Sequence, residues 1–266
     1  MRISFVGGGV MAESILGGIL EAKIATPNDI LVGEPITDRR GYLHKKYGVL
    51  VDSSNQKIIE NAEIVILSVK PQNLAEIMGD IGPVLDAEKT VLSIIAGAKI
   101  GSLTDGLGHA SVIRVMPNTP AQIGEGMSVW TASDSVPTTT INNCQNILST
   151  LGKEIYVDDE KFIDMATALS ASGPAYIFLF IEAMIDAGVY IGMSREMASD
   201  LVLQTIFGST KLVMETGRNP SDLKDMVTSP GGTTAEALLA FERGAFKGMV
   251  IDAVAAAHEK SKALGG

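Results

Sequence analysis

The chain has 266 residues, of which 46% are hydrophobic and 20% are charged, and its formal net charge is −10 at pH 7. This composition is typical of a folded protein with a sizeable core and excludes an intrinsically disordered chain. Because the balance is acidic and no run of Lys or Arg occurs, we expect no nucleic-acid partner and no anionic membrane surface as a partner.

Metal and disulfide chemistry are not expected. Cys144 is the only cysteine, so an intrachain disulfide is impossible and a cysteine metal cluster has too few ligands. The histidines are far apart in the sequence and form no ligand-spaced motif: His44, His109 and His258. We therefore expect structural or surface roles for all three and no metal site.

Targeting segments are not expected either. The first residues are too short in apolar length for a signal peptide. The most apolar helix candidate, 175–193, contains Glu182 and Asp186, which favours a buried or interface helix over a membrane span. The sequence therefore predicts a cytoplasmic protein without a membrane partner.

Short β-branched runs alternate with helical patterns through residue 158. Strands are expected at 3–6, 30–32, 64–69, 91–95, 112–116, 127–132 and 154–157, and a helix at 11–21. Continuous apolar runs are typical of parallel strands that are covered on both faces. The alternation predicts a doubly wound, mostly parallel sheet in an α/β domain.

A glycine-rich loop joins the first strand to the first helix. It reads Gly7-Gly8-Gly9-Val10-Met11-Ala12, which places Gly7, Gly9 and Ala12 in a G-x-G-x-x-A pattern. The first glycine permits a tight turn, the second lets the backbone approach a pyrophosphate, and the small third residue permits close helix–strand packing. The helix N-terminus would face the phosphates. The loop predicts binding of a dinucleotide.

Glu34 follows the second strand, where an acidic side chain can accept hydrogen bonds from ribose hydroxyls. This position favours NADH, because a carboxylate would repel the 2′-phosphate of NADPH. Arg39 and Arg40 lie nearby and could instead meet such a phosphate, or they could be solvated surface charges at a helix start.

Further turns follow predicted strands, where ligands of open α/β sheets gather. They are Val69-Lys70-Pro71-Gln72, Ala96-Gly97 and the stiff segment 114–120, whose two prolines enclose Asn118 and Thr119. The polar groups of the last segment would face the crevice, with Asn118 among the cofactor contacts. A purely structural turn is the alternative.

From residue 159 on, nearly every segment is predicted to be helical. Helix starts are expected at Pro174, at Ser194 for a helix through Glu215, at Asn219-Pro220, and at Thr233, which has Glu236 at capping-box spacing. Two domains follow: a nucleotide-binding domain at 1–158 and an all-helical domain at 159–266.

The loop before the last of these starts predicts an anion site. Gly231 and Gly232 would expose backbone N–H groups to a carboxylate, helped by the helix dipole. The hydroxyls of Ser229, Thr233 and Thr234 can donate and accept hydrogen bonds. An ordinary interhelical loop is the alternative.

Together these segments resemble the pyrroline-5-carboxylate reductase family nearly end to end. The likeness includes the glycine loop, 69–72, 114–120, Ser172-Gly173-Pro174-Ala175-Tyr176 and, most specifically, 223–234. The resemblance implies a Rossmann domain and a helical domain that interleaves with a partner in a homodimer, with decamers common in the family. It also implies reduction of 1-pyrroline-5-carboxylate to L-proline by NADPH or NADH, the last step of proline biosynthesis.

The resemblance also implies residue roles. Asn55, Val69-Lys70-Pro71 and Ala96-Gly97 would line the cofactor cleft, and the loop from Ser229 to Thr234 would hold the substrate carboxylate and imine. One stretch departs from the family: Gly33-Glu34-Pro35 does not look like the polar or basic pattern of NADPH-preferring members.

The chemistry expected of the protein itself is modest. No His–Asp or Cys–His dyad is visible, and imine reduction needs none, because the cofactor carries the hydride and the protein orients the reactants. Thr234 is the residue expected to meet the ring nitrogen. Two rivals remain: a β-hydroxyacid dehydrogenase-like enzyme, for which Lys161 is a poorly placed catalytic lysine, and a non-catalytic dinucleotide-binding redox sensor.

Overall fold

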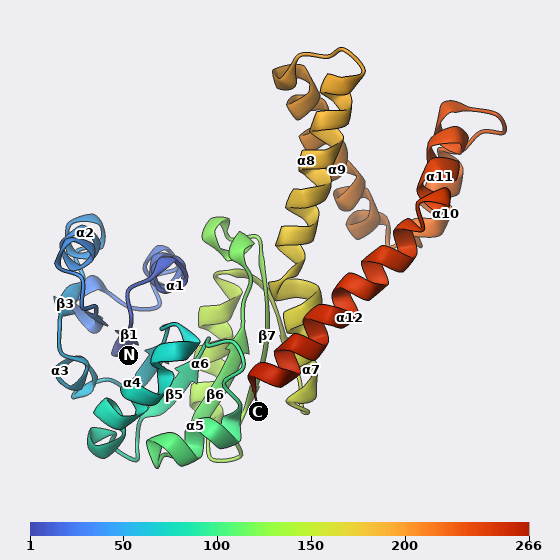
Figure 1. The fold of residues 1–266 in the computed structure, drawn as a ribbon. Coiled ribbons are helices and arrows are strands. Elements are labelled where there is room, and N and C mark those ends of the chain that lie inside the picture. The colour runs from blue at the N-terminus through green and yellow to red at the C-terminus, as the bar shows by residue number, and fades with distance from the viewer. Residues whose placement is uncertain (266) are drawn as a thin grey trace. The chain divides into compact units, whose positions relative to one another are not determined.

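The computed structural model describes residues 1–265, which form two compact units (Figure 1). The first unit contains Met1–Ser172 and the end of the chain from Ala257, and the second contains Gly173–Ala256. The helical character begins near residue 159, as predicted, but the first compact unit extends to residue 172. The cause is packing, because Ile163 is fully buried against Met116 and Val129 of the sheet.

The first unit is built on an eight-stranded sheet with the order β3-β2-β1-β4-β5-β6-β7-β8. The strands are β1 (Ile3–Val6), β2 (Ile30–Gly33), β3 (Leu50–Asp52), β4 (Ile64–Leu67), β5 (Thr90–Ser93), β6 (Val112–Met116), β7 (Gly126–Ala132) and β8 (Gly152–Tyr156). All neighbours are parallel except β6 and β7. The predicted doubly wound sheet is confirmed. The short edge strand β3 was not predicted.

Helices cover both faces of this sheet. They are α1 (Val10–Glu21), α2 (Thr37–Tyr47), α3 (Asn55–Ile59), α4 (Leu74–Ile81), α5 (Ile100–Leu107), α6 (Thr138–Ser149) and α7 (Lys161–Ala166). Side chains of β1 alternate between two cores: Phe5 packs with α1 and α6, and Val6 with α3, α4 and α5. Cys144 of α6 is fully buried in the first core. The continuous apolar runs of the strands follow from burial on both faces.

A π-helical turn, Thr167–Ala171, leads from α7 to the helices of the second unit. These are α8 (Gly173–Tyr190), α9 (Arg195–Thr216), α10 (Pro220–Met226), α11 (Thr233–Arg243) and the first part of α12 (Phe246–Leu264). Two predicted caps are confirmed. The Ser194 side chain accepts a hydrogen bond from Met197 N at 3.2 Å, and that of Asn219 accepts one from Ser221 N at 2.9 Å. Pro174 is the second residue of α8 rather than the first.

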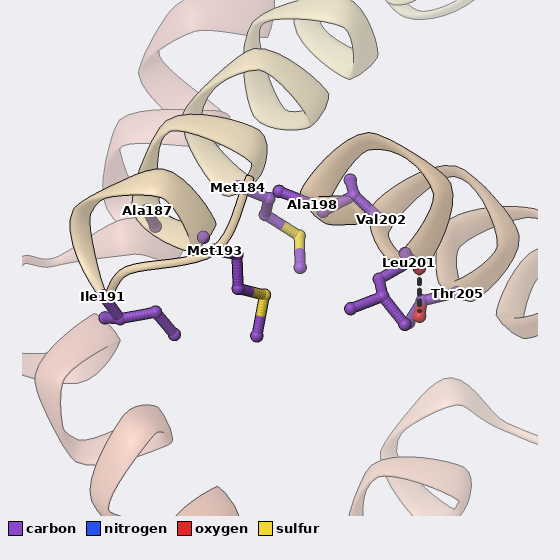
Figure 2. Close-up of a pocket in the computed structure, with 9 residues that line it drawn as sticks. Met184, Ala187, Ile191, Met193, Ala198, Leu201, Val202 and Thr205 are labelled. Carbon is purple, nitrogen blue, oxygen red and sulfur yellow. Dashed lines mark hydrogen bonds between the residues drawn. The ribbon is translucent and has the colours of Figure 1, made fainter. Parts of the chain in front are cut away.

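Within the second unit, α8 and α9 pack closely at Gly188. A Cβ atom on Gly188 would lie 2.7 Å from the Cβ of Ala198, so only glycine permits this approach. Beside the contact is an apolar cavity of about 290 Å³ lined by Met184, Ala187, Gly188, Ile191, Met193, Ala198, Leu201, Val202 and Thr205. Figure 2 shows side chains of both helices and of the turn between them around this cavity.

The second unit leaves much apolar surface exposed. No residue of α8 is buried, and Phe178 and Leu179 are 60% and 66% exposed. On α12, Ile251 is 67% exposed. By length and composition alone, the continuous helical stretch Lys161–Tyr190 also meets the requirement for a membrane span. A surface of this kind marks an interaction site.

Candidate cofactor and substrate sites

The glycine loop has the geometry that the sequence predicts. Gly7 has a φ of 97° and donates its N–H to Gly33 O at 2.8 Å. A Cβ atom on Gly7 would lie 2.5 Å from Ser68 O, so only glycine fits. Beside Gly9, in contrast, a Cβ atom would have no neighbour within 4 Å. The loop is therefore tight against β4 at its start and open where it leads into α1.

The start of α1 offers unpaired donors. Within residues 1–265, the backbone N–H groups of Val10, Met11 and Ala12 have no acceptor, and the first helical bond is Glu13 N to Gly9 O at 2.9 Å. These N–H groups and the helix dipole form a site for an anion. Open backbone at Gly9 and free donors beyond it fit a pyrophosphate.

Glu34 is oriented toward the glycine loop. Its side chain is 7% exposed, with Oε2 accepting the Gly8 N–H at 3.0 Å and Oε1 accepting the Ile36 N–H at 2.9 Å. The carboxylate thus ties the loop to the end of β2, a role that the sequence pattern did not indicate. A carboxylate can accept more than two hydrogen bonds, so Glu34 can still meet ribose hydroxyls. That contact stays a prediction.

Arg39 and Arg40 are anchored to backbone carbonyls rather than freely solvated. Arg39 donates from Nε to Gly8 O at 2.6 Å and from Nη2 to Gly9 O at 3.2 Å. Arg40 donates from Nη1 to Glu34 O at 2.6 Å. The Glu34 carboxylate therefore binds one N–H of the glycine loop, and the Arg39 guanidinium binds two carbonyls of the same loop.

Glu13, in the first turn of α1, completes this support. Its carboxylate accepts hydrogen bonds from Arg39, Tyr42, Lys46 and Tyr47 of α2, at 2.6 to 2.9 Å. Burial raises the pKa of Glu13, but the four donors outweigh it and lower the pKa to about 2. The side chain is therefore an anion at any physiological pH and links α1 to α2.

A cleft of about 350 Å³ opens at the carboxyl ends of the central strands. It is lined by Gly9, Val10, Met11, Ser68, Val69, Lys70, Pro71, Ile94, Ile95, Ala96, Met116 and Pro117. The strand order reverses between β1 and β4, and ligands of such sheets bind at this point. The structure thus brings together the glycine loop and the predicted turns 69–71 and 96. Ile94, Ile95 and Met116 were missed, because apolar lining residues look like ordinary strand core in a sequence.

Other predicted cofactor residues lie outside this lining. Asn55 donates from Nδ2 to Asp80 Oδ2 at 3.0 Å and lies beside Gly33, at the end of β2. Asn118 uses both ends of its amide, with Oδ1 accepting Met127 N–H at 2.9 Å and Nδ2 donating to Ser170 O at 3.3 Å. The side chain of Asn118 therefore fixes the turn after β6, which favours the structural alternative for this residue.

The predicted substrate loop precedes α11 in the second unit. The N-cap of α11 is Gly232, and Thr233 is its first residue, so the predicted capping box of Thr233 and Glu236 is wrong. Gly231, with a φ of 68°, turns the chain, and Gly232 N donates to Ser229 O at 3.0 Å. A Cβ atom on Gly232 would collide with the Oγ of Ser229 and would lie 3.2 Å from the Ser229 backbone O. The space beside Ser229 therefore favours glycine at the cap of α11.

The start of α11 presents donors and a hydroxyl. The backbone N–H groups of Thr233, Thr234 and Ala235 have no acceptor among residues 1–265. Thr234 is half-buried, and its hydroxyl makes no hydrogen bond in this part of the chain. Three free N–H groups at a helix N-terminus can receive a carboxylate, and the adjacent hydroxyl can meet a neighbouring polar atom.

Family models match both parts of the chain. Residues 160–264 match the model described as pyrroline-5-carboxylate reductase dimerisation, and residues 2–97 match the model described as NADP oxidoreductase coenzyme F420-dependent. The first match covers the α11 loop, and the second covers the glycine loop and Glu34.

Relatives with the same domain plan are found in distant organisms. Pyrroline-5-carboxylate reductase of Synechocystis is 39% identical over 265 residues, covering 100% of this chain and 98% of the relative. The Escherichia coli protein of that name is 39% identical over 264 residues, covering 99% and 98%. The crystal structure of Plasmodium falciparum pyrroline carboxylate reductase with NADP bound is 36% identical, with a TM-score of 0.91 over 100% of this chain and 98% of that one. Since the likeness runs through both candidate sites and the full length, the chain belongs to the pyrroline-5-carboxylate reductase family.

Proposed function

We propose that this chain reduces 1-pyrroline-5-carboxylate to L-proline with hydride from NADPH or NADH, the last step of proline biosynthesis. The observation that carries the proposal is the start of α11, where three free N–H groups lie beside the unpaired hydroxyl of Thr234. Three N–H donors can bind a carboxylate, and the adjacent hydroxyl can meet a ring nitrogen that is bonded to the α-carbon of that carboxylate. The substrate 1-pyrroline-5-carboxylate has both of these features. Full-length relatives that are named for this reaction support the assignment.

The first unit holds the cofactor in this proposal. The N–H groups of Val10, Met11 and Ala12 bind the pyrophosphate, and Gly9 permits its close approach. Val69 and Ala96 line the cleft beyond the loop. The bound nicotinamide supplies the hydride, and the protein supplies orientation and a shielded site. A relative of known structure binds NADP, which supports a nicotinamide dinucleotide here.

The second unit holds the substrate. Backbone donors at residues 233–235 fix the carboxylate and thereby the ring. The Thr234 hydroxyl accepts a hydrogen bond from the protonated imine and donates one to the product amine, because a hydroxyl can do both without moving. No general base is required, since the imine arrives protonated or takes its proton from this hydroxyl or from water.

Oxidation of a hydroxy acid is disfavoured by the position of Lys161. A β-hydroxyacid dehydrogenase needs a base or a lysine at the alcohol. The Nζ of Lys161 pairs with Asp159 Oδ2 at 2.6 Å on the surface, where its side chain is 61% exposed. It therefore lies at a solvent-facing ion pair rather than in the cleft of the first unit.

We also propose that the protein is a homodimer formed through the second unit. The exposed apolar faces of α8, α9 and α12, and the dimerisation model that matches 160–264, support this assembly. Larger rings such as decamers, the cytoplasmic location, and the lack of nucleic-acid and membrane partners stay predictions.

A direct assay tests the activity. The purified chain is mixed with NADPH or NADH, and oxidation of the cofactor is followed by absorbance on addition of pyrroline-5-carboxylate, with L-proline identified as the product. We expect turnover with the imine and none with β-hydroxy acids and the oxidised cofactors. Binding of cofactor without turnover of the imine would instead favour the redox-sensor alternative.

A further inference from the structure

The turn after β5 contacts the end of the chain. This turn, residues 94–99, contributes Ile94, Ile95 and Ala96 to the wall of the cleft. Gly97 has a φ of 76°, and a Cβ atom on it would lie 2.9 Å from Leu264 Cβ and 3.0 Å from Leu264 O. The last turn of α12 therefore contacts the turn that lines the cleft, with the Leu264 side chain 53% exposed, and both belong to the first unit.

A buried hydroxyl anchors the end of α12. Ser261 is 3% exposed and is the only buried residue of this helix among those described. Its Oγ donates to Asp164 Oδ1 at 3.3 Å. Leu264 lies three residues further on, on the same face of the helix, so the anchor and the contact with Gly97 act together.

Asp164, which binds Ser261, is also connected through Arg114 to Ile100, just after the turn. The Arg114 side chain is fully buried and donates to Asp164 Oδ1 at 2.8 Å and to Glu160 Oε1 at 2.7 Å. Glu160 Oε1 also accepts the N–H of Ile100, the first residue of α5, at 2.8 Å. Two carboxylates share one guanidinium, and the Ser261 hydroxyl supplies Asp164 with a further donor. Ile100 is thus bonded to the network that also anchors Ser261, and Gly97 contacts the helix end that this anchor holds.

We propose that Ser261 and Leu264, the C-terminal latch, are positioning residues for the cofactor. The latch holds the Ala96–Gly97 turn in the shape that admits the dinucleotide, so that this shape does not have to be selected from a mobile ensemble during binding. Order that exists before binding raises affinity by lowering the entropic cost. The proposal rests on the cofactor assignment of the cleft, and it gives the latch no part in the chemistry.

The first experiment compares two variants with a matched control. One variant ends at Lys260 and the other is Ser261→Ala. The control is Lys262→Ala, whose side chain pairs with Glu259 at the surface and with no other residue of 1–265. We expect the KM and the Kd for NADPH to rise about tenfold in the shortened chain and about threefold in Ser261→Ala, the scale of lost hydrogen bonds and packing. The kcat at saturating NADPH, the KM for pyrroline-5-carboxylate and the control should change less than about twofold.

A second experiment isolates the contact. Gly97→Ala is made in the full chain and in the chain that ends at Lys260. The substitution strains the backbone at the positive φ equally in the full and the shortened chain. The difference between its effects on the Kd in the two chains therefore reports the collision with Leu264. We expect Gly97→Ala to raise the Kd for NADPH more in the full chain than in the shortened one.

The proposal would be overturned by wild-type NADPH affinity in both Ser261→Ala and the shortened chain, or by strictly additive effects of truncation and Gly97→Ala. A fall in kcat without a change in cofactor Kd would also contradict it. The Kd is measured by cofactor fluorescence without substrate. A failure of the proposed reaction is therefore distinguishable from a failure of the latch, and Ser261→Ala keeps the test valid if the shortened chain does not fold.

Discussion

Glu34 is a residue whose position in the sequence and whose contacts indicate different roles. By position it follows β2, where acids meet ribose, and by contact it accepts the N–H of Gly8 and of Ile36. Both roles are compatible, because a carboxylate has acceptor positions beyond those used by these two hydrogen bonds. We predict that the charge affects which dinucleotide is preferred, while the hydrogen bonds tie the loop to the end of β2.

Replacing Glu34 by Ser should shift cofactor preference toward NADPH. Repulsion between a carboxylate and a 2′-phosphate in a partly desolvated crevice is worth about 1–2 kcal/mol, so the ratio of kcat/KM with NADPH to that with NADH should rise roughly tenfold. Glu34→Gln removes the charge but keeps an acceptor, and it should show the same shift in the ratio. Steady-state kinetics with both cofactors measures it. An unchanged ratio in both variants would mean that the carboxylate serves the loop alone.

Thr234 is predicted to act on the substrate rather than on the fold. Its hydroxyl makes no hydrogen bond within residues 1–265, and Gly232, not a threonine, caps α11. Thr234→Ala should therefore lower kcat/KM by about ten- to a hundredfold, the scale of a lost hydrogen bond of about 1.5–3 kcal/mol to a charged group. Cofactor affinity and Tm should change little, and Thr234→Ser should restore most of the activity. Full activity in the alanine variant, or an equal loss of stability, would make the residue structural.

At the scale of elements, the junction of α1 and α2 is organised by one carboxylate. Glu13 receives Arg39, Tyr42, Lys46 and Tyr47, and Arg39 in turn holds the carbonyls of Gly8 and Gly9. Glu13 also lies in the first turn of α1, where a negative charge is favoured by the helix dipole. The support of the glycine loop is thus largely side-chain chemistry from α2.

Glu13→Gln should lower the free energy of unfolding by about 1–2 kcal/mol at pH 7, since a largely buried anion loses its charge-assisted donors. The pKa of Glu13 is lowered from 4.5 to about 2 in the folded protein. The stabilising effect is therefore complete above the unfolded pKa and is lost as the pH falls from about 5 to about 2. Urea unfolding from pH 7 to pH 3 should show the gap between variant and wild type closing.

The control for this measurement is Glu76→Gln. Glu76 is an exposed acid in the first turn of α4 and makes no ion pair among the described residues. Its replacement should change the free energy of unfolding by less than about 0.5 kcal/mol at each pH. A gap for Glu13→Gln that stays constant with pH would show that packing, and not charge, is lost.

An element could be predicted where neighbouring residues in the sequence determine it, and not where distant contacts do. Strands β1, β4 and β6 and the caps Ser194 and Asn219 were predictable, because apolar runs and cap chemistry are local. The edge strand β3 was not, because it has three residues and depends on pairing with β2. The predicted cap of α11 was wrong, because a glycine can cap a helix about as well as a threonine. The space beside Ser229 favours glycine at this position. The anchoring of Arg39 and the burial of Arg114 depend on contacts distant in sequence.

At the scale of the whole molecule, the proposed dimer would cover the exposed apolar helices of the second unit. Sedimentation at micromolar concentration should show a dimer or a multiple of it, and an active monomer would contradict the proposed assembly. Leu179→Asp, on exposed α8, should weaken assembly strongly, because an unpaired buried charge costs several kcal/mol. Ile123→Asp is the matched control, since Ile123 is 78% exposed in the first unit and its replacement should leave the dimer intact.

The boundary of the units belongs to this scale as well. A boundary at residue 158 was predicted from the change of composition, and it marks where helices begin. The contacts of Ile163 and of Asp164 keep the next segment with the sheet. The ion pair of Asp164 with Arg114 joins residues 50 positions apart, so a change of composition alone does not reveal such contacts.

The buried thiol of Cys144 makes the protein a convenient host for spectroscopic labels. Burial raises the pKa of Cys144 to about 12, and thiol reagents attack the thiolate. The folded chain should therefore be silent to maleimides, although it contains a cysteine. A single cysteine introduced at an exposed site of the first unit such as Ile123, which is 78% exposed, would become the one reactive group. Fluorophores or spin labels could then be attached at chosen points without first removing the native cysteine and disturbing the core around α6.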